Sequence, residues 1–453
     1  MNAPRSAALE VLERRLDARC EAPIAIAFSG GGDSLALMLA AHDFARRTGR
    51  RLVALHVDHG LQPLSAAWAD QAETAAARLG VPMIRLAWTG PKPSSGLPAA
   101  ARGARHRLIA EACRTLGAAV ALIGHTLDDQ LENALMRGAG VPVGALREWT
   151  PSPVWPEGRG LFLCRPLLAV RRADLRAWLA AEGLSWLDDP ANADLRYARV
   201  RARQALAEGA DCVPVARPDL RSLKDLWRMT AWGGVVVDRP GLMSAAPDQA
   251  LRLLQLAAAC ASGVQGLARP GRARGVMARL TGDKAFTVSL CGARIAADVD
   301  WMTFEREAGE MERGGLEPIV IEAGQTKVWD GRFEIAAGKA DVRVEALRGH
   351  AARLDAQDRA AMLGVCVSAR PALPVFRPLD DDRAAPRLAL DGARAHIDFN
   401  GPSCRTLCED RLAAAAGMVT CETEIGEAEI GQSPAWRNLF GRPIYGREVR
   451  TDG

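Results

Sequence analysis

The sequence has no apolar run of about 20 residues, the length that a membrane-spanning helix needs, and no charged start followed by an apolar stretch marks a secretory leader. It also has no C-x-x-C pair among its ten cysteines, so a zinc or iron–sulfur site built on paired thiolates is not indicated. His396, Cys404, Cys408 and Cys421 near the end are candidate metal ligands, but the C-x₃-C spacing is weak evidence, and we expect the three cysteines to be buried free thiols. These absences favour a cytoplasmic protein with reduced cysteines and no membrane partner.

A strong excess of one charge is missing as well. The 58 basic and 54 acidic residues give a formal net charge of +4, so any surface for a polyanion has to be local. Hydrophobic residues make up 49% of the chain and charged residues 25%, the proportions of an ordinary globular protein. Wholesale disorder is therefore excluded, and 453 residues suffice for two to four folded units.

Short apolar runs alternate with amphipathic stretches from residue 22 to residue 203, the pattern of βαβ units around a parallel sheet. The expected strands are Ile24–Phe28, Leu52–Val57, Pro82–Trp88, Ala118–Ile123 and Leu161–Cys164. The expected helices are one through Leu35 and His42, then Gln71–Leu79, Ala99–Leu116 and Asp128–Arg137. We predict an α/β domain with a doubly wound parallel sheet over residues 1–205.

The patterns are weaker after residue 205. A linker or connecting helix over Ala205–Pro218 precedes an expected helix over Asp219–Trp232, and Pro247–Ala261 shows a clearer apolar stripe. The later segments with strand character are Ala285–Leu290, Ala293–Ala297, Pro318–Ile321, Val328–Ile335 and Pro443–Val449. We predict a mixed or mainly helical middle domain over residues 206–314 and a small α+β or β-rich domain over residues 315–453.

The strongest motif is Ser29-Gly30-Gly31-Gly32-Asp33-Ser34, which lies between an expected strand and an expected helix. Consecutive glycines let the backbone turn tightly and aim several N–H groups at one point, where the helix N-terminus adds positive partial charge. Such a loop fits a phosphate, and the missing Gly-Lys-Ser/Thr ending disfavours a kinase or GTPase. The alternative is an ordinary turn in which Asp33 or Ser34 caps the helix.

Charged side chains also follow the third and fourth strands. Asp128 and Glu132 share one face of the helix after the fourth strand, at the edge where open α/β sheets bind ligands, so we expect both to face a cleft and to hold Mg²⁺ or an ammonium group. The alternative is that these acidic residues only stabilise the N-terminus of the helix through its macrodipole. For Asp129 this structural role and a functional role are equally supported. Arg102 and Arg105 share a helical face and suit a phosphate or carboxylate, unless they form a solvated basic stripe.

Residues 165–203 contain eight arginines and five acidic residues, a local charge of 8 − 5 = +3. This surplus is typical of a surface that binds an RNA backbone, although an ordinary charged helix face has the same composition. Trp178, Trp186 and Tyr197 suit stacking on unpaired bases or packing in a core.

Together these motifs resemble the PP-loop of the N-type ATP pyrophosphatases and, more closely, the tRNA(Ile)-lysidine synthase family. The resemblance rests on Ser29–Ser34, Leu55–Leu61, Leu97–His106, Gly124–Asn133, Met136–Gly140, Arg165–Leu168 and Trp186–Arg203. The last segment resembles the family signature D-P-S-N-x-D-x-x-Y-x-R-N-x-x-R, which sulfur-inserting relatives lack. Pro98, Thr126 and Val200 depart from the family pattern, outside the residues assigned to catalysis.

The resemblance implies an adenine nucleotide alpha hydrolase-like fold and a ligase for which ATP and Mg²⁺ are required. The implied reaction joins free L-lysine to C2 of the wobble cytidine of a CAU-anticodon tRNA(Ile) through an adenylated cytidine, and changes codon reading from AUG to AUA. The implied catalytic residues are Asp33, Arg105, Asp128 and Glu132, with Mg²⁺ on Asp33 and Asp128. ATP would contact Ser29, Gly30, Gly31, Gly32, Asp33, Ser34, Asp58, His59, Gly124 and His125, and tRNA would contact Arg196, Arg199, Arg201 and Arg203.

Two other functions stay open. One is another PP-loop adenylating enzyme, a tRNA thiolase or an amidating synthetase, although no cysteine pair or cysteine near the loop supports sulfur chemistry. The other is a catalytically silent tRNA-binding protein, which the intact acidic and basic motif residues disfavour. Because isoleucine and methionine tRNAs share the CAU anticodon, we expect the region after Ala205 to read the rest of the tRNA.

Overall fold

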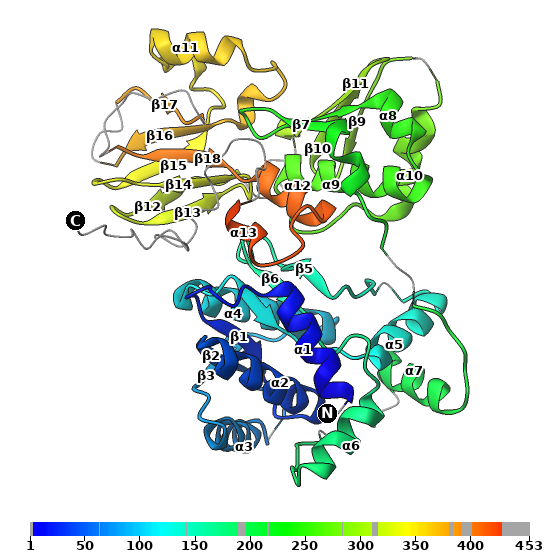
Figure 1. The fold of residues 1–453 in the computed structure, drawn as a ribbon. Helices are drawn as coiled ribbons and strands as arrows, with labels where there is room; N and C mark the ends of the chain where they lie inside the picture. Colours follow the sequence, from blue (N-terminus) through cyan, green and yellow to red (C-terminus); the bar gives the residue numbers. More distant parts are fainter. Residues whose placement is uncertain are drawn as a thin grey trace, which may run out of the picture. The chain divides into compact units, whose positions relative to one another are not determined.

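The computed structural model describes residues 3–62, 64–141, 143–188, 196–214, 217–282, 284–309, 316–379, 384–390 and 401–427. The chain divides into two compact units (Figure 1). The first unit comprises Met1–Arg217 together with Val419–Gly453, and the second unit comprises Pro218–Met418. Within the described ranges, no helix is both long and apolar enough to cross a membrane.

The first unit is built on a six-stranded sheet with the order β3-β2-β1-β4-β6-β5. Its strands are β1 (Ile24–Ala27), β2 (Leu52–Asp58), β3 (Met83–Ala87), β4 (Val120–Leu122), β5 (Trp149–Pro151) and β6 (Phe162–Cys164). All pairs are parallel except β5 with β6, so the predicted α/β class is confirmed and one edge of the sheet is antiparallel. Consecutive residues of β1 point to opposite faces, and Ile24, Ala25 and Ile26 are all fully buried, so both faces are covered.

Seven helices surround this sheet in the described part of residues 1–217. They are α1 (Ala3–Arg15), α2 (Gly32–Thr48), α3 (Ser65–Arg78), α4 (Leu97–Leu116), α5 (Leu127–Gly138), α6 (Arg172–Ala181) and α7 (Ala198–Ala207). The four helices expected from periodicity, α2 to α5, are confirmed. The sequence patterns did not indicate α1, α6, α7 or β5, which are short or weakly amphipathic.

A late segment of the chain returns to the first unit and ends in α13 (Glu424–Glu427). The carboxylate of Glu422 accepts two hydrogen bonds from the guanidinium of Arg50, at 2.5 and 2.9 Å, and a third from the Asp17 backbone N–H at 2.9 Å. The Arg50 and Glu422 side chains are only 1% and 3% exposed. A buried bidentate pair of this kind holds the returning segment firmly on the first unit.

The second unit begins with a mixed region. A 3₁₀ turn (Arg221–Leu226) leads into a five-stranded antiparallel sheet of order β7-β8-β11-β10-β9. Its elements are β7 (Trp227–Met229), β8 (Val235–Asp238), α8 (Arg239–Ser244), α9 (Pro247–Ser262), α10 (Pro270–Arg279), β9 (Phe286–Leu290), β10 (Ala293–Ala297) and β11 (Trp301–Arg306). The helix expected over Asp219–Trp232 is therefore wrong, because residues 227–229 pair with β8.

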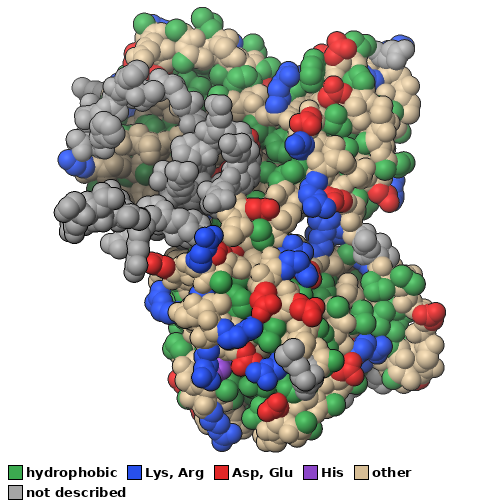
Figure 2. Space-filling view, in the orientation of Figure 1, with side chains coloured by type: hydrophobic (Ala, Val, Ile, Leu, Met, Phe, Trp, Pro, Cys, Tyr) green, Lys and Arg blue, Asp and Glu red, His purple; other side chains and the backbone are tan. Residues whose placement is uncertain are grey.

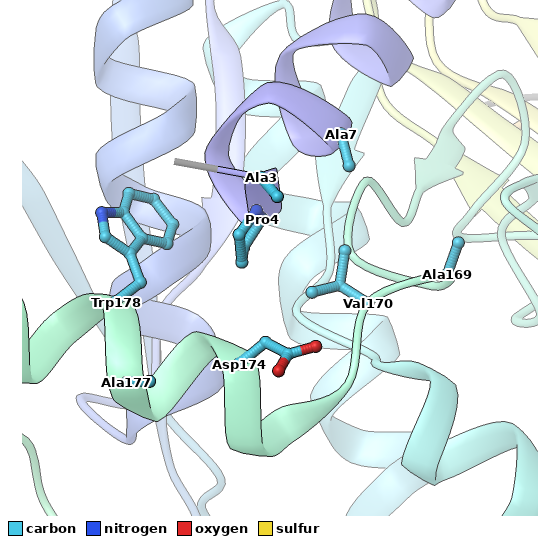
Figure 3. Close-up of a pocket in the computed structure, with 8 residues that line it drawn as sticks. All are labelled: Ala3, Pro4, Ala7, Ala169, Val170, Asp174, Ala177 and Trp178. Carbon is cyan, nitrogen blue, oxygen red and sulfur yellow. The ribbon is translucent and has the colours of Figure 1, made fainter. Parts of the chain in front are cut away.

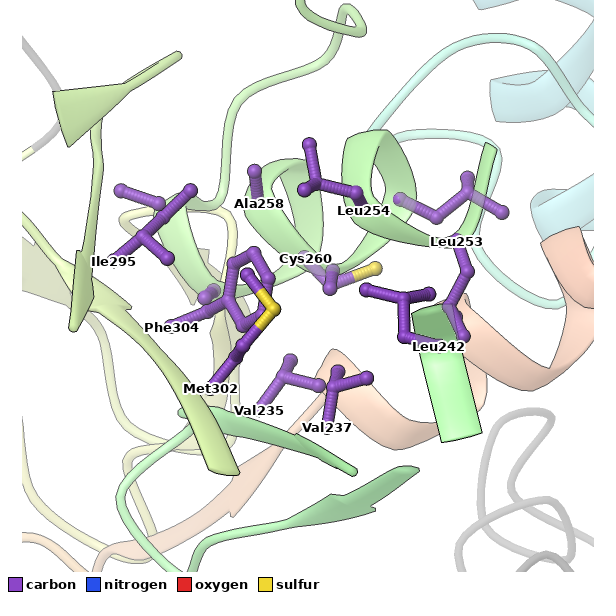
Figure 4. Packing of buried hydrophobic residues seen from close by; sticks show 14 of the residues in the cluster. Val235, Val237, Leu242, Leu253, Leu254, Ala258, Cys260, Ile295, Met302 and Phe304 are labelled. Carbon is purple, nitrogen blue, oxygen red and sulfur yellow. The ribbon is translucent and has the colours of Figure 1, made fainter. Parts of the chain in front are cut away.

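The core of this region lies between α9 and the sheet (Figure 4). Leu254, Ala258 and Cys260 of the helix pack near Ile295 and Phe304 of the strands, and all five are buried. The confirmed helix at 247–261 owes its position to this continuous apolar face. The middle region is thus mixed rather than mainly helical.

The rest of the second unit forms two small antiparallel sheets, β12-β15-β16-β17 and β13-β14-β18. The elements are β12 (Ile319–Ile321), β13 (Thr326–Trp329), β14 (Phe333–Ala336), β15 (Val342–Ala346), α11 (Ala356–Leu363), β16 (Pro374–Pro378), β17 (Arg387–Leu388), β18 (Ser403–Thr406) and α12 (Cys408–Ala416). The strand expected over Val328–Ile335 is split by a turn at Asp330 and Gly331, both with positive φ. The expected strand Pro443–Val449 lies outside the described residues, and the division at residues 314 and 315 stays a prediction.

Candidate active site

The glycine-rich loop and the start of α5 meet at the reversal point of the sheet. β1 pairs with β2 on one side and with β4 on the other, so the strand order changes direction between β1 and β4. Ser29–Ser34 follows β1, and Gly124 follows β4. A Cβ atom on Gly124 would lie 3.2 Å from the carbonyl oxygen of Asp33, so glycine is needed where the two loops touch.

Trp186 and Leu187, which follow α6 in the sequence, pack against the loop. Gly30 has φ +83°, and its carbonyl accepts a hydrogen bond from Leu187 N–H at 3.0 Å. A Cβ on Gly30 would lie 2.6 Å from the Leu187 side chain, and one on Gly32 would lie 3.4 Å from the Trp186 ring. The helix N-cap is Gly31, with no side-chain cap, so the alternative of a capping Asp33 is not supported.

Arg172, at the start of α6, connects three carboxylates around the loop. Its Nε donates to Asp33 Oδ2 at 3.0 Å, its Nη1 donates to Glu132 Oε1 at 3.0 Å, and its Nη2 lies 3.5 Å from Asp129 Oδ2. Burial by itself would lower the pKa of Arg172, but Asp129, Asp33 and Glu132 raise it above its ordinary value. Burial raises the pKa of Asp33, and Arg172 opposes this only in part. Sequence reasoning placed Arg172 in an RNA patch, because nothing in the sequence relates it to Asp33.

Glu132 is enclosed instead of facing a cleft, which corrects the expectation from helical spacing. Its side chain is 0% exposed. Besides Arg172, it accepts a hydrogen bond from Arg203 Nε at 2.9 Å, and its Oε2 lies 3.7 Å from Arg199 Nε. Oε2 has no hydrogen-bond partner among the described residues. Three arginines therefore compensate one buried carboxylate.

Asp128 stabilises the N-terminus of α6, and Asp129 stabilises the N-terminus of α5. Asp128 Oδ2 accepts the Arg172 backbone N–H at 2.7 Å, and its Oδ1 pairs with Arg171 at 3.1 Å, so it anchors the first turn of α6. Asp129 Oδ2 accepts the backbone N–H and the hydroxyl of Thr126 at 2.8 and 3.0 Å, as in a capping box. The helix-terminal alternative is supported for Asp129, and Thr126, a departure from the family pattern, is the N-cap of α5.

Two arginines of α4, Arg102 and Arg105, interact electrostatically with Asp129. Arg105 is half-buried, and its Nε is enclosed with no hydrogen-bond partner among the described residues. Burial, with help from Arg102 and Arg199, lowers the pKa of Arg105 to about 10. The alternative of a solvated basic stripe does not hold for this pair. An enclosed cation without a partner is costly, so an anion bound here would be favoured.

The pKa values of two histidines of the site are lowered. Burial and the neighbouring Arg165 hold the pKa of His125 well below its usual value. The Nδ1 atom of His125 accepts a hydrogen bond from Arg165 Nε at 3.0 Å, so its proton must reside on Nε2. Burial and Arg105 lower the pKa of His59, and Asp58 next to it accepts the Gly60 N–H at 2.8 Å.

The arginines of α7 point partly into the site. Arg199 donates to Asn133 Oδ1 at 2.8 Å and to Asp129 Oδ1 at 3.4 Å, while Arg203 binds Glu132. Arg201 donates to the carbonyl of Arg196 at 2.9 Å. Residues 189–195 of the signature lie outside the described residues. Of the three aromatic residues, Trp178 is buried, Trp186 covers the loop, and Tyr197 is exposed.

Other parts of the described structure offer less chemistry. Within it, no group of three His, Cys, Asp or Glu side chains could hold a metal. Cys408 is a buried thiol that donates to the Gly233 and Cys260 carbonyls at 3.2 Å, and His396 lies outside the described residues. A surface hollow beside α1 and α6 is lined mainly by apolar side chains, with Asp174 as the one charged residue (Figure 3). Trp178 lines it, but none of the expected catalytic, ATP-binding or tRNA-binding arginine residues does.

The chain matches known proteins over most of its length. Residues 6–210 match the family model of the PP-loop domain. A tRNA(Ile)-lysidine synthase from Caulobacter vibrioides is 44% identical, over 91% of this chain and 97% of that protein. Proteins of the same name from Hyphomonas neptunium and Mesorhizobium japonicum are 37% and 33% identical, over 69% and 90% of this chain and 89% and 93% of their own lengths.

Proposed function

The chain belongs to the tRNA(Ile)-lysidine synthase family, and from this premise we propose that it joins free L-lysine to C2 of the wobble cytidine in a CAU-anticodon tRNA(Ile). It is a PP-loop, ATP-dependent ligase of tRNA(Ile)-lysidine synthesis. The change of codon reading from AUG to AUA follows from the proposed product. The reaction takes place in the cytoplasm, a location that ten free cysteines suit.

The proposed chemistry has two steps. The C2 oxygen of cytidine attacks the α-phosphorus of ATP, and the bond to the β-phosphate oxygen breaks, so pyrophosphate leaves. The neutral ε-amine of lysine then attacks C2, and the C2–O bond breaks with release of AMP. Adenylation is needed because the unmodified oxygen is a poor leaving group.

One observation supports the ATP assignment most strongly. The loop Ser29–Ser34 leads into α2, whose first backbone N–H groups have no side-chain cap. The enclosed Nε of Arg105, on α4, has no hydrogen-bond partner among the described residues. A triphosphate would satisfy both. Asp58, His59, Gly124 and His125, at the ends of β2 and β4, would then border the nucleotide.

The carboxylates near the loop fit Mg²⁺, which prefers oxygen ligands. Asp33, and less directly Asp128, would hold the ion, which would supply positive charge beside the departing pyrophosphate. Asp33 Oδ2 already accepts a hydrogen bond from Arg172 Nε, so a metal ion at this carboxylate would share it with the guanidinium.

Asp128 and Glu132 have different roles in this proposal. Asp128 is partly exposed and would bind one cation, either Mg²⁺ together with Asp33 or the ammonium group of the incoming lysine. Glu132 is enclosed and orients Arg172, Arg199 and Arg203 around the site. Arg196, just before α7, and Arg201, an exposed residue of α7, would contact tRNA. Arg199 and Arg203 would act on tRNA only through the position of α7.

The test is direct. The full chain is incubated with labelled lysine, ATP and a tRNA(Ile) transcript with a CAU anticodon, and the nucleosides are analysed for lysidine. A methionine tRNA with the same anticodon is the matched control. We expect lysine incorporation and pyrophosphate release only with tRNA(Ile). ATP cleavage that requires sulfide or ammonia instead of lysine would identify another PP-loop enzyme, and tRNA binding without cleavage would identify a silent binding protein.

A further inference from the structure

One stretch of the second unit has no acidic residue. Residues 249–282 contain five arginines and no aspartate or glutamate, in a chain whose 58 basic and 54 acidic residues nearly balance. The arginines are Arg252, Arg269, Arg272, Arg274 and Arg279, and the last four flank or belong to α10. By contrast, basic and acidic side chains lie side by side on the visible face of the first unit (Figure 2).

Helix α10 presents these arginines to solvent. Its buried face consists of Ala273, Val276 and Leu280, which pack in the core with α9 and β9. Arg269, Arg272, Arg274 and Arg279 are all exposed. Among the described residues, none forms an ion pair or side-chain hydrogen bond with these four arginines.

The outer ridge of α10 is made of small residues. Gly271, Gly275 and Ala278 are exposed and follow one another at helical spacing, with Arg274 on one side and Arg272 and Arg279 on the other. A Cβ atom on Gly271 or Gly275 would meet nothing within 4 Å, and neither glycine has positive φ. The fold therefore does not require these glycines, although a glycine inside a helix costs about 1 kcal/mol relative to alanine. Because Gly271 and Gly275 have no side chains, a ligand can approach the helix backbone closely at these positions.

We propose that α10 is a binding surface for the sugar–phosphate backbone of tRNA. The inference rests on the proposed function and assigns one of the surfaces by which the region after Ala205 reads the tRNA. Guanidinium groups bind phosphate oxygens in a bidentate way, and a ridge without side chains lets two rows of arginines reach one backbone. The outer face has no large apolar side chain to insert into a lipid surface, which disfavours a membrane.

The experiment measures binding of a tRNA(Ile) transcript to the full chain over a series of salt concentrations. In the variant R272A/R274A/R279A, the dissociation constant should rise about tenfold or more near 0.1 M salt, and the slope of log affinity against log salt should fall by about 2 to 3. The variant R272K/R274K/R279K keeps the charges and should keep the slope. ATP affinity should stay unchanged in both variants.

A matched control removes three exposed arginines elsewhere. R46A/R78A/R359A changes the net charge equally at positions on α2, α3 and α11 that are also exposed. It should alter the salt slope by less than one. Unchanged tRNA affinity and slope in the α10 variant, with folding verified by thermal unfolding, would overturn the proposal.

Two further outcomes separate the proposal from the proposed function. If the wild-type chain forms no lysidine but the α10 variant still loses tRNA affinity, the function is wrong and the surface stands. If lysidine forms and α10 variants bind tRNA normally, the function stands and the surface is wrong. Loss of binding to phosphatidylserine vesicles, with tRNA binding intact, would assign α10 to a membrane and also overturn the proposal.

Discussion

Two arginine-rich regions of this chain differ in what their side chains contact. Around α5 to α7, Arg172, Arg199 and Arg203 surround the buried carboxylate of Glu132. On α10 the arginines are exposed, and no carboxylate of the described chain pairs with them. Both regions carry a basic surplus, 8 − 5 = +3 over residues 165–203 and 5 − 0 = +5 over residues 249–282, so charge counting alone assigns both to RNA. If α10 binds tRNA as proposed, an arginine surplus predicts an RNA surface only where the arginines are not paired with carboxylates of the same protein.

The largest effect is expected from breaking the buried network. Arg172→Ala leaves Asp33 and Glu132 without their shared partner, and removal of one partner of a buried pair costs about 3–5 kcal/mol. Pyrophosphate release should fall by at least about 10², the usual loss for a site electrostatic contact. Arg171→Ala, which removes an exposed ion pair to Asp128, is the control and should cost at most about 1 kcal/mol. Equal stability and activity in the two variants would contradict the network.

A second large effect is expected at the loop. Asp33→Asn keeps the size of the side chain but removes the charge that Arg172 and a metal ion would share. Lysine-dependent pyrophosphate release should fall by about 10² or more, while tRNA affinity and its salt dependence stay as in the wild type. The check is steady-state pyrophosphate release beside tRNA binding. Near-normal turnover would show that Asp33 is only part of the helix start.

A smaller effect is expected on the pH dependence of the free energy of unfolding, through two buried histidines of the first unit. Burial and neighbouring arginines lower the pKa of His106 to about 3, and that of His125 lies well below its usual value. In the unfolded chain both histidines take up protons near pH 6.5. The free energy of unfolding should therefore decrease as the pH falls below about 6.5, by at most about 1.4 kcal/mol per pH unit for each histidine.

The variant that checks this is His106→Leu, because Nδ1 of His106 has no hydrogen-bond partner among the described residues. Urea unfolding between pH 7 and pH 5 should show a flatter decrease for the variant. Parallel curves for variant and wild type would mean that His106 is protonated in the folded state. Phosphate contacts at α10 should make tRNA affinity depend on salt.

The smallest effect concerns the ridge of α10. Gly275→Ala should raise the free energy of unfolding by about 0.5–1 kcal/mol, because the added methyl group meets open space. Denaturant unfolding of the second unit's transition measures this gain. A loss of stability would show that Gly275 serves the fold rather than access to the helix.

The sequence predicted the parts of the fold that depend on local patterns. β1, β2 and α4 were expected within a few residues of their observed bounds. Continuous apolar runs indicate the two strands, and a helical repeat of apolar residues indicates α4. The split at Asp330 and Gly331 and the pairing of Trp227 with β8 depend on tertiary contacts, so local patterns missed them.

The site shows the same limit. Helical spacing correctly put Asp128 and Glu132 on α5 at the end of β4, but spacing cannot show which carboxylate is enclosed. Arg172 reaches Asp33 across 139 positions of sequence, and no short motif encodes such a contact. A truncation near residue 205, a possible test of tRNA reading, would also remove Glu422, the carboxylate that pairs with the buried Arg50. Point variants of the full chain are therefore the better test.

The most direct measurement of the central claim compares Arg203→Gln with R272A/R274A/R279A in one assay of tRNA(Ile) affinity against salt. If paired arginines build the site and exposed arginines bind RNA, Arg203→Gln lowers lysidine formation but leaves the salt slope unchanged, whereas the α10 variant lowers the slope by about 2 to 3. A slope reduced by about one in Arg203→Gln and unchanged in the α10 variant would contradict the account.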